Sequence, residues 1–275
     1  MVRWAVARIA ASLIVATMAS GLAPAPPGSD ATVRFARISN DPVAHGARLS
    51  RVLGCSGCHG ALLTGQDWSE PGFARIWTSN LTRAVPSYSD PQLAAAIRGG
   101  VRRDGSPLWD MPSHLFMQIA NSDMTAVIAY LRSRPPAGPA RPLPVFEAGA
   151  RKEIADGRYR SSPANVARVD TALPADLGAE FALGRHIVRA TCAECHGPDL
   201  RGGVPYPGAI ARPDLRIAAG YDAEQFERLL TNGIAIGDRD VGLMSQVARG
   251  RYKYLTEDER AAVLAYLHRL AQPTS

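Results

Sequence analysis

The sequence has little cysteine, few aromatic residues and no long run of charge of one sign. Only four of its 275 residues are cysteine, which excludes a disulfide-rich secreted scaffold. The 31 basic and 25 acidic residues are scattered, with basic residues grouped at most in short pairs such as Arg102–Arg103. The chain has no basic stripe of the kind that nucleic-acid-binding proteins present, so no nucleic-acid partner is expected. A hydrophobic content of 46% excludes a disordered chain and indicates a globular one.

The chain also has no uninterrupted apolar run of ordinary transmembrane length. Arg3 and Arg8 precede an apolar stretch from Ile9 to Met18, and small residues and a proline-rich break follow. This order is typical of an export signal, and it predicts a signal peptide over residues 1–25. The stretch 9–25 has 17 residues, the short limit for crossing a bilayer, so an uncleaved N-terminal anchor stays open as the alternative.

The four cysteines form two pairs, each followed at once by histidine. The two motifs are Cys55-Ser-Gly-Cys58-His59 and Cys192-Ala-Glu-Cys195-His196. Cys-x-x-Cys-His is the attachment signature of c-type haem, because two thiols one helical turn apart reach the two vinyl groups of one porphyrin and the histidine reaches the iron. Disulfides, a thioredoxin-like redox pair and a zinc site are the alternatives, and each leaves the repeated histidine unexplained.

The surroundings of the two motifs repeat at a spacing of 137 residues. In each half a helix precedes the motif, a second helix ends at glycine, a methionine follows eleven residues after Gly100 or Gly233, and an amphipathic helix closes the unit. We expect Asp90, Ser122, Asp222 and Thr256 to begin helices. The sequence predicts an all-α fold of two tandem cytochrome c-like helical domains, at residues 36–133 and 178–272.

The segment between the repeats, residues 134–177, fits neither of them. It contains five prolines between residues 135 and 144, which favour an extended backbone and disfavour a helix. Residues 147–172 are polar and weakly patterned. The sequence allows two interpretations of this segment, a mobile Pro-rich linker and a strap packed over one domain.

A proximal histidine leaves one axial position on each iron. Met111 and Met244 are the predicted sixth ligands, because they occupy the same position of the repeat and a thioether is a common partner of histidine on cytochrome c iron. The rivals are His114 and Met117 in the first half and His186 and His268 in the second, and we interpret both of these last histidines as surface residues. Each proximal imidazole also needs a hydrogen-bond acceptor, which we expect to be a backbone carbonyl near Ser79 or Pro213.

With these motifs the chain resembles a diheme member of the class I cytochrome c family over residues 40–133 and 178–271. Asn80-Leu81-Thr82, residues 97–101 and Met111-Pro112 are further similar to the cytochrome subunits of bacterial membrane-bound dehydrogenases. The chain departs from those subunits in having two motifs where they often have three, and in Ser245 where proline would follow the methionine. The resemblance implies two covalently bound haem c groups and electron transfer between redox proteins, such as a dehydrogenase or a terminal oxidase, in the periplasm or at the outer face of the membrane.

The competing function is a haem enzyme, such as a diheme peroxidase or a sulfur-compound oxidase, in which one iron keeps an open site. A methionine at the repeat position of both halves argues against it. So does the commitment of all four cysteines to haem attachment, which leaves none as a thiolate ligand. No catalytic residue is therefore predicted.

Overall fold

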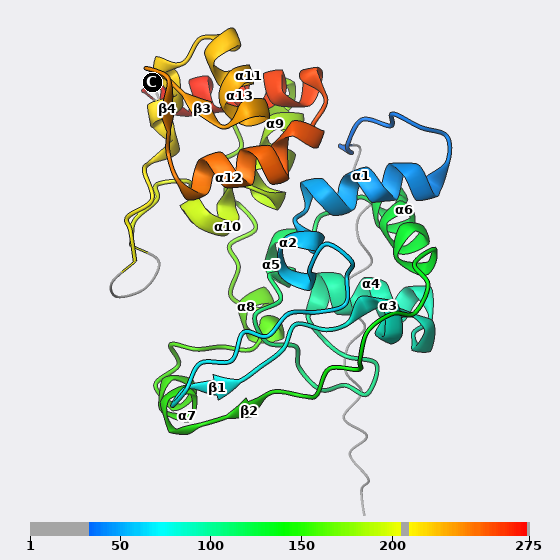
Figure 1. Cartoon of the computed structure of the whole chain (residues 1–275). Coiled ribbons are helices and arrows are strands. Elements are labelled where there is room, and N and C mark those ends of the chain that lie inside the picture. Colours follow the sequence, from blue (N-terminus) through cyan, green and yellow to red (C-terminus); the bar gives the residue numbers. More distant parts are fainter. Residues whose placement is uncertain (1–32, 205–208, 274–275) are drawn as a thin grey trace, which may run out of the picture.

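The computed structural model describes residues 33–204 and 209–273, and the predicted signal or anchor at 1–25 lies outside them (Figure 1). No helix within the described ranges is long and apolar enough to cross a membrane. The first domain has the following elements: α1 (Pro42–Val52), α2 (Cys55–His59), β1 (Ala74–Arg75), α3 (Leu81–Ala84), the 3-10 helix η1 (Val85–Ser87), α4 (Asp90–Gly99), α5 (Ser113–Phe116) and α6 (Asn121–Arg132). The second has η2 (Ala179–Phe181), α9 (Ala182–Ala190), α10 (Ala193–His196), η3 (Leu215–Gly220), α11 (Ala223–Asn232), β3 (Ile234–Ala235), β4 (Arg239–Asp240), α12 (Leu243–Gly250), η4 (Tyr252–Tyr254) and α13 (Glu257–Ala271).

Each domain is built around a close crossing of its first and last long helices. In the first domain α1 crosses α6 at Gly46, where a Cβ atom would lie 1.8 Å from the carbonyl oxygen of Ala126. In the second, α9 crosses α13 at Gly184, where a Cβ would lie 2.2 Å from the carbonyl oxygen of Ala262. Only glycine allows two helix backbones to approach this closely. The repeat seen in the sequence is therefore a repeat of helix packing.

Most of the predicted helix boundaries are confirmed. Asp222 and Thr256 both form capping boxes, and Gly100 and Gly233 end their helices with a positive φ of 71° and 74°. Helix α4 begins at Asp90, as predicted, and the hydroxyl of the preceding Ser89 accepts from the Gln92 backbone N–H. One predicted start is wrong, because Ser122 lies inside α6, which begins at Asn121.

The segment between the domains is a strap that packs on the first domain, as Figure 1 shows below β1. The five prolines between residues 135 and 144 form no helix, as expected, but β2 (Val145–Phe146), α7 (Ala148–Ala155) and α8 (Ser162–Val166) follow them. Strand β2 pairs antiparallel with β1, and the Asn80 side chain donates to the carbonyl oxygens of Ala137 and Pro139. Of the two interpretations left open by the sequence, the structure shows the packed strap.

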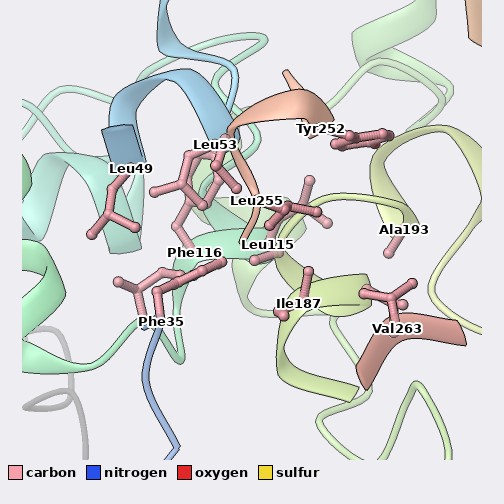
Figure 2. Close-up of a cluster of buried hydrophobic side chains, with 14 of the residues drawn as sticks. Phe35, Leu49, Leu53, Leu115, Phe116, Ile187, Ala193, Tyr252, Leu255 and Val263 are labelled. Atoms are coloured by element: carbon pink, nitrogen blue, oxygen red, sulfur yellow. The ribbon is translucent and has the colours of Figure 1, made fainter. Parts of the chain in front are cut away.

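The two domains share one apolar core. Figure 2 shows this cluster, which joins side chains of the first domain with side chains of α9, α10, η4 and α13. A buried ion pair crosses the same contact, with Nη1 of Arg48 2.7 Å from Oε2 of Glu259, and the two side chains are 5% and 0% exposed. Because apolar burial and this ion pair both span the boundary, the domains are fixed relative to each other.

Candidate haem-binding sites

The first motif forms the short helix α2 between two glycines. Gly54 and Gly60 have φ values of 79° and 80°, so the chain turns sharply on both sides of the motif. His59 is buried, and its Nδ1 lies 2.8 Å from the carbonyl oxygen of Ser79, which confirms the predicted acceptor. This contact occupies Nδ1 and leaves Nε2 as the nitrogen for a metal. Burial lowers the pKa of His59, which favours the neutral, ligating form of the imidazole.

An open cavity lies beside this helix. Cys55, Cys58, His59 and Met111 all border it. The remaining wall is largely apolar and includes Leu93, Ile97, Val127, Leu131, Trp68 and Trp77. Two thiols, an imidazole and a thioether around one apolar cavity are the donor set that a covalently attached haem requires, so the residues fit that group.

The second motif repeats this geometry. Helix α10 follows Cys192, and Nδ1 of the buried His196 lies 2.8 Å from the carbonyl oxygen of Pro213, the predicted acceptor. Burial lowers the pKa of His196 as well. Each proximal imidazole therefore has a backbone carbonyl as the partner of its Nδ1, which leaves its Nε2 for the iron.

Met244 differs from Met111 in its local structure. Met111 lies in the loop before α5, whereas Met244 lies in the first turn of α12. Ser245, which replaces proline, donates its hydroxyl to the carbonyl oxygen of Gly233 at 2.5 Å and accepts from the Val241 N–H at 2.8 Å. Two hydrogen bonds of a buried serine therefore fix this segment where a proline ring fixes the other.

All four cysteines are free thiols, and none forms a disulfide. Burial raises the pKa of each thiol, and that of Cys58 to about 11. All four thiols are thus unpaired and neutral, and the two thiols of each motif are present for attachment to a porphyrin.

The structure places the rival sixth ligands away from the first cavity. His114 and Met117 border a different cavity, between the two domains. His186 packs edge-on against Phe35 with ring centroids 5.3 Å apart and is only 5% exposed, so its interpretation as a surface residue was wrong. Nε2 of His268 contacts the carbonyl oxygens of Ala218 and Tyr221. Met111 and Met244 stay the predicted ligands.

Three residues at these sites were not singled out from the sequence. The hydroxyl of Tyr159 in the strap donates to the carboxylate of Asp110, the neighbour of Met111, at 2.8 Å. Arg251 and Glu194 form an ion pair beside both motifs. No local pattern marks these residues, because their partners are 49 and 57 positions away in the chain.

The comparisons with known proteins agree with this geometry. The model of the cytochrome c family matches residues 43–135 and 181–271. The chain is 26% identical to the cytochrome c subunit of a quinone alcohol dehydrogenase from Gluconacetobacter polyoxogenes, over 83% of this chain and 56% of that protein. It is 23% identical to a fructose dehydrogenase cytochrome subunit from Gluconobacter japonicus, over 82% of this chain and 52% of that protein.

The chain spans about half the length of these curated relatives. The family match covers both repeats, and each repeat has its own Cys-x-x-Cys-His motif on a short helix. This chain therefore belongs to the cytochrome c family, as a tandem pair of domains whose two Cys-x-x-Cys-His motifs carry two covalently bound haem c groups.

Proposed function

We propose that each domain holds its haem through its own motif and its own methionine. Cys55 and Cys58 attach one porphyrin, and His59 and Met111 are the axial ligands of its iron. In the second domain Cys192 and Cys195 attach the porphyrin, and the axial ligands are His196 and Met244. The observation that carries this proposal is that both cysteines, the histidine and the methionine of the first domain border one apolar cavity.

The bound haem supplies an iron that changes reversibly between the ferrous and ferric states, and the protein residues set how easily it does so. The carbonyl oxygens of Ser79 and Pro213 accept from Nδ1–H of His59 and His196, which orients each ring and makes its Nε2 more basic. The apolar wall of the cavity excludes water, and a thioether ligand favours the reduced iron. These features suit an electron carrier with two six-coordinate irons.

We further propose that the chain is the electron-transfer subunit of a membrane-bound dehydrogenase, in the periplasm or at the outer face of the membrane. The names of the relatives support this partner, and the basic and apolar N-terminal segment supports export. The proposed organisation is a signal peptide or anchor at 1–25, haem domains at 36–133 and 178–272, and the strap at 134–177. Rapid reduction of the purified protein by the dehydrogenase encoded beside its gene would test the pathway, and failure of every neighbouring oxidoreductase to reduce it would refute it.

Substitution of the methionines tests the ligand assignment. The reduced wild-type protein should show low-spin spectra for two haems and should not bind carbon monoxide rapidly. Met244→Ala and Met111→Ala should each lower the potential of one haem and open one site to carbon monoxide. Met117→Leu is the control, because Met117 borders the other cavity and its loss should change neither property. Rapid stoichiometric binding of carbon monoxide by the wild-type protein would favour a haem enzyme instead.

A further inference from the structure

Arg251 connects the second domain to the first haem-attachment motif. It follows α12, and its Nε donates to the carbonyl oxygen of Val52 at 3.2 Å. The guanidinium lies against Gly54, where a Cβ atom would be 2.6 Å from the guanidinium carbon. Gly54 directly precedes Cys55 and caps α2. The arginine therefore contacts the backbone that leads into the first motif.

The same guanidinium forms an ion pair with the second motif. Its Nη1 lies 2.6 Å from Oε2 of Glu194, which stands between Cys192 and Cys195. Glu194 also borders the haem cavity of the first domain, although it belongs to the motif of the second. The first motif has Gly57 at the corresponding position, so one carboxylate is shared by the two sites. The side chains of Arg251 and Glu194 are only 14% and 28% exposed.

The position of this ion pair has an electrostatic consequence. Reduction adds one electron to a haem iron, so a nearby positive charge favours the reduced state and a nearby negative charge favours the oxidised state. Because the pair is largely shielded from water, its charges act more strongly than charges on the surface do. A charge beside both motifs acts on both irons.

We propose that Arg251 and Glu194 are positioning residues that set the potentials of the two haems together. Arg251 fixes the first motif through the Val52 carbonyl and raises both potentials, while Glu194 opposes it from between the cysteines of the second motif. The inference rests on haem attachment at both motifs as proposed above. It makes the domain boundary part of the redox machinery, because the haem of the first domain is tuned partly by two residues of the second domain.

Redox titration of the full-length protein, followed in the visible spectrum, tests this inference. Arg251→Met should lower both midpoint potentials, and Glu194→Gln should raise both. The double variant should return them towards the wild-type values, and Arg251→Lys should shift them less than Arg251→Met because it keeps the charge. A merely structural role would not produce shifts of opposite sign in the two single variants.

Arg249→Met is the matched control. Arg249 lies on α12 two positions earlier, is 44% exposed and pairs with Asp240 instead of with a residue of either motif, so its loss should leave both potentials unchanged. Haem content is measured first, as pyridine haemochrome per chain, and fewer than two haems in the wild type would refute the proposed function itself. With two haems present, the inference is refuted if Glu194→Gln leaves both potentials unchanged, shifts only one of them, or shifts them in the same direction as Arg251→Met. If Arg251→Met does not fold, the midpoint potentials of Glu194→Gln and Arg251→Lys test the inference in its place.

Discussion

The crossing of α1 and α6 at Gly46 allows a quantitative prediction for Gly46→Ala. In an open helix this change would stabilise the protein by about 1 kcal/mol, because alanine has the higher helix propensity. Here the new Cβ would lie 1.8 Å from the Ala126 carbonyl oxygen and 2.9 Å from Cβ of Tyr130, whereas ordinary contacts begin at 3.4 Å. The obstacle is backbone, so the two helices must separate by about 1.6 Å at this point, the difference between these distances.

A separation of this size costs more than the propensity gain. A gap of 0.5 to 1 Å already forfeits roughly a quarter to a half of each dispersion contact, and both helices bury apolar side chains, among them Leu49 and Val52 of α1 and Val127 and Leu131 of α6. Overpacking of a core costs about 3 kcal/mol or more when backbone must move. We expect a net loss of about 2 kcal/mol, equivalent to a decrease in Tm of roughly 4–8 °C for a chain of this size.

Urea denaturation followed by circular dichroism would measure this loss. Gly250→Ala is the matched control, because Gly250 ends α12 with open space where a Cβ would lie, so its replacement should be neutral or stabilising by up to about 1 kcal/mol. Gly184→Ala should behave like Gly46→Ala, since its Cβ would lie 2.2 Å from the Ala262 carbonyl oxygen. An unchanged or increased stability of Gly46→Ala would refute the argument that the helix contact requires glycine.

Three further predictions concern residues outside the haem ligands. Arg48→Met leaves the buried carboxylate of Glu259 without its ion-pair partner and should cost about 3–5 kcal/mol in urea denaturation, and a loss below about 1 kcal/mol would contradict this. Desolvation lowers the pKa of His186 to about 4 from 6.5, so the unfolded chain binds a proton at this residue more readily than the folded protein does. The free energy of unfolding is therefore highest above pH 6.5 and falls by roughly 3 kcal/mol in total as the pH falls towards 4. His186→Leu should flatten the stability profile between these pH values, and an unchanged slope would show that another group titrates there. Tyr159→Phe removes the hydrogen bond to Asp110 beside Met111 and should strengthen imidazole binding to the first ferric haem by roughly 2- to 10-fold, whereas equal binding would show that the strap does not hold the ligand loop.

Features that depend only on residues close together in the sequence were predicted from it. The two motifs, their spacing and the glycine-to-methionine distance are contiguous patterns, and the capping boxes at Asp222 and Thr256 need only four residues each. The backbone acceptors near Ser79 and Pro213 were also predicted, because the second ring nitrogen of each proximal imidazole needs a hydrogen-bond acceptor. Local rules still failed at α6, where Asn121 begins the helix ahead of Ser122.

The sequence by itself determined that this protein is a tandem pair of helical haem domains, because covalent attachment and helix capping are encoded over a few consecutive residues. Only the tertiary structure decided that the strap packs on the first domain, that His186 is buried, and that Arg251 links Glu194 of the second motif to the backbone before the first. These features join residues far apart in the chain through an apolar core shared by both domains. Which distant side chains meet depends on how two amphipathic surfaces fit each other, and no short pattern records that fit.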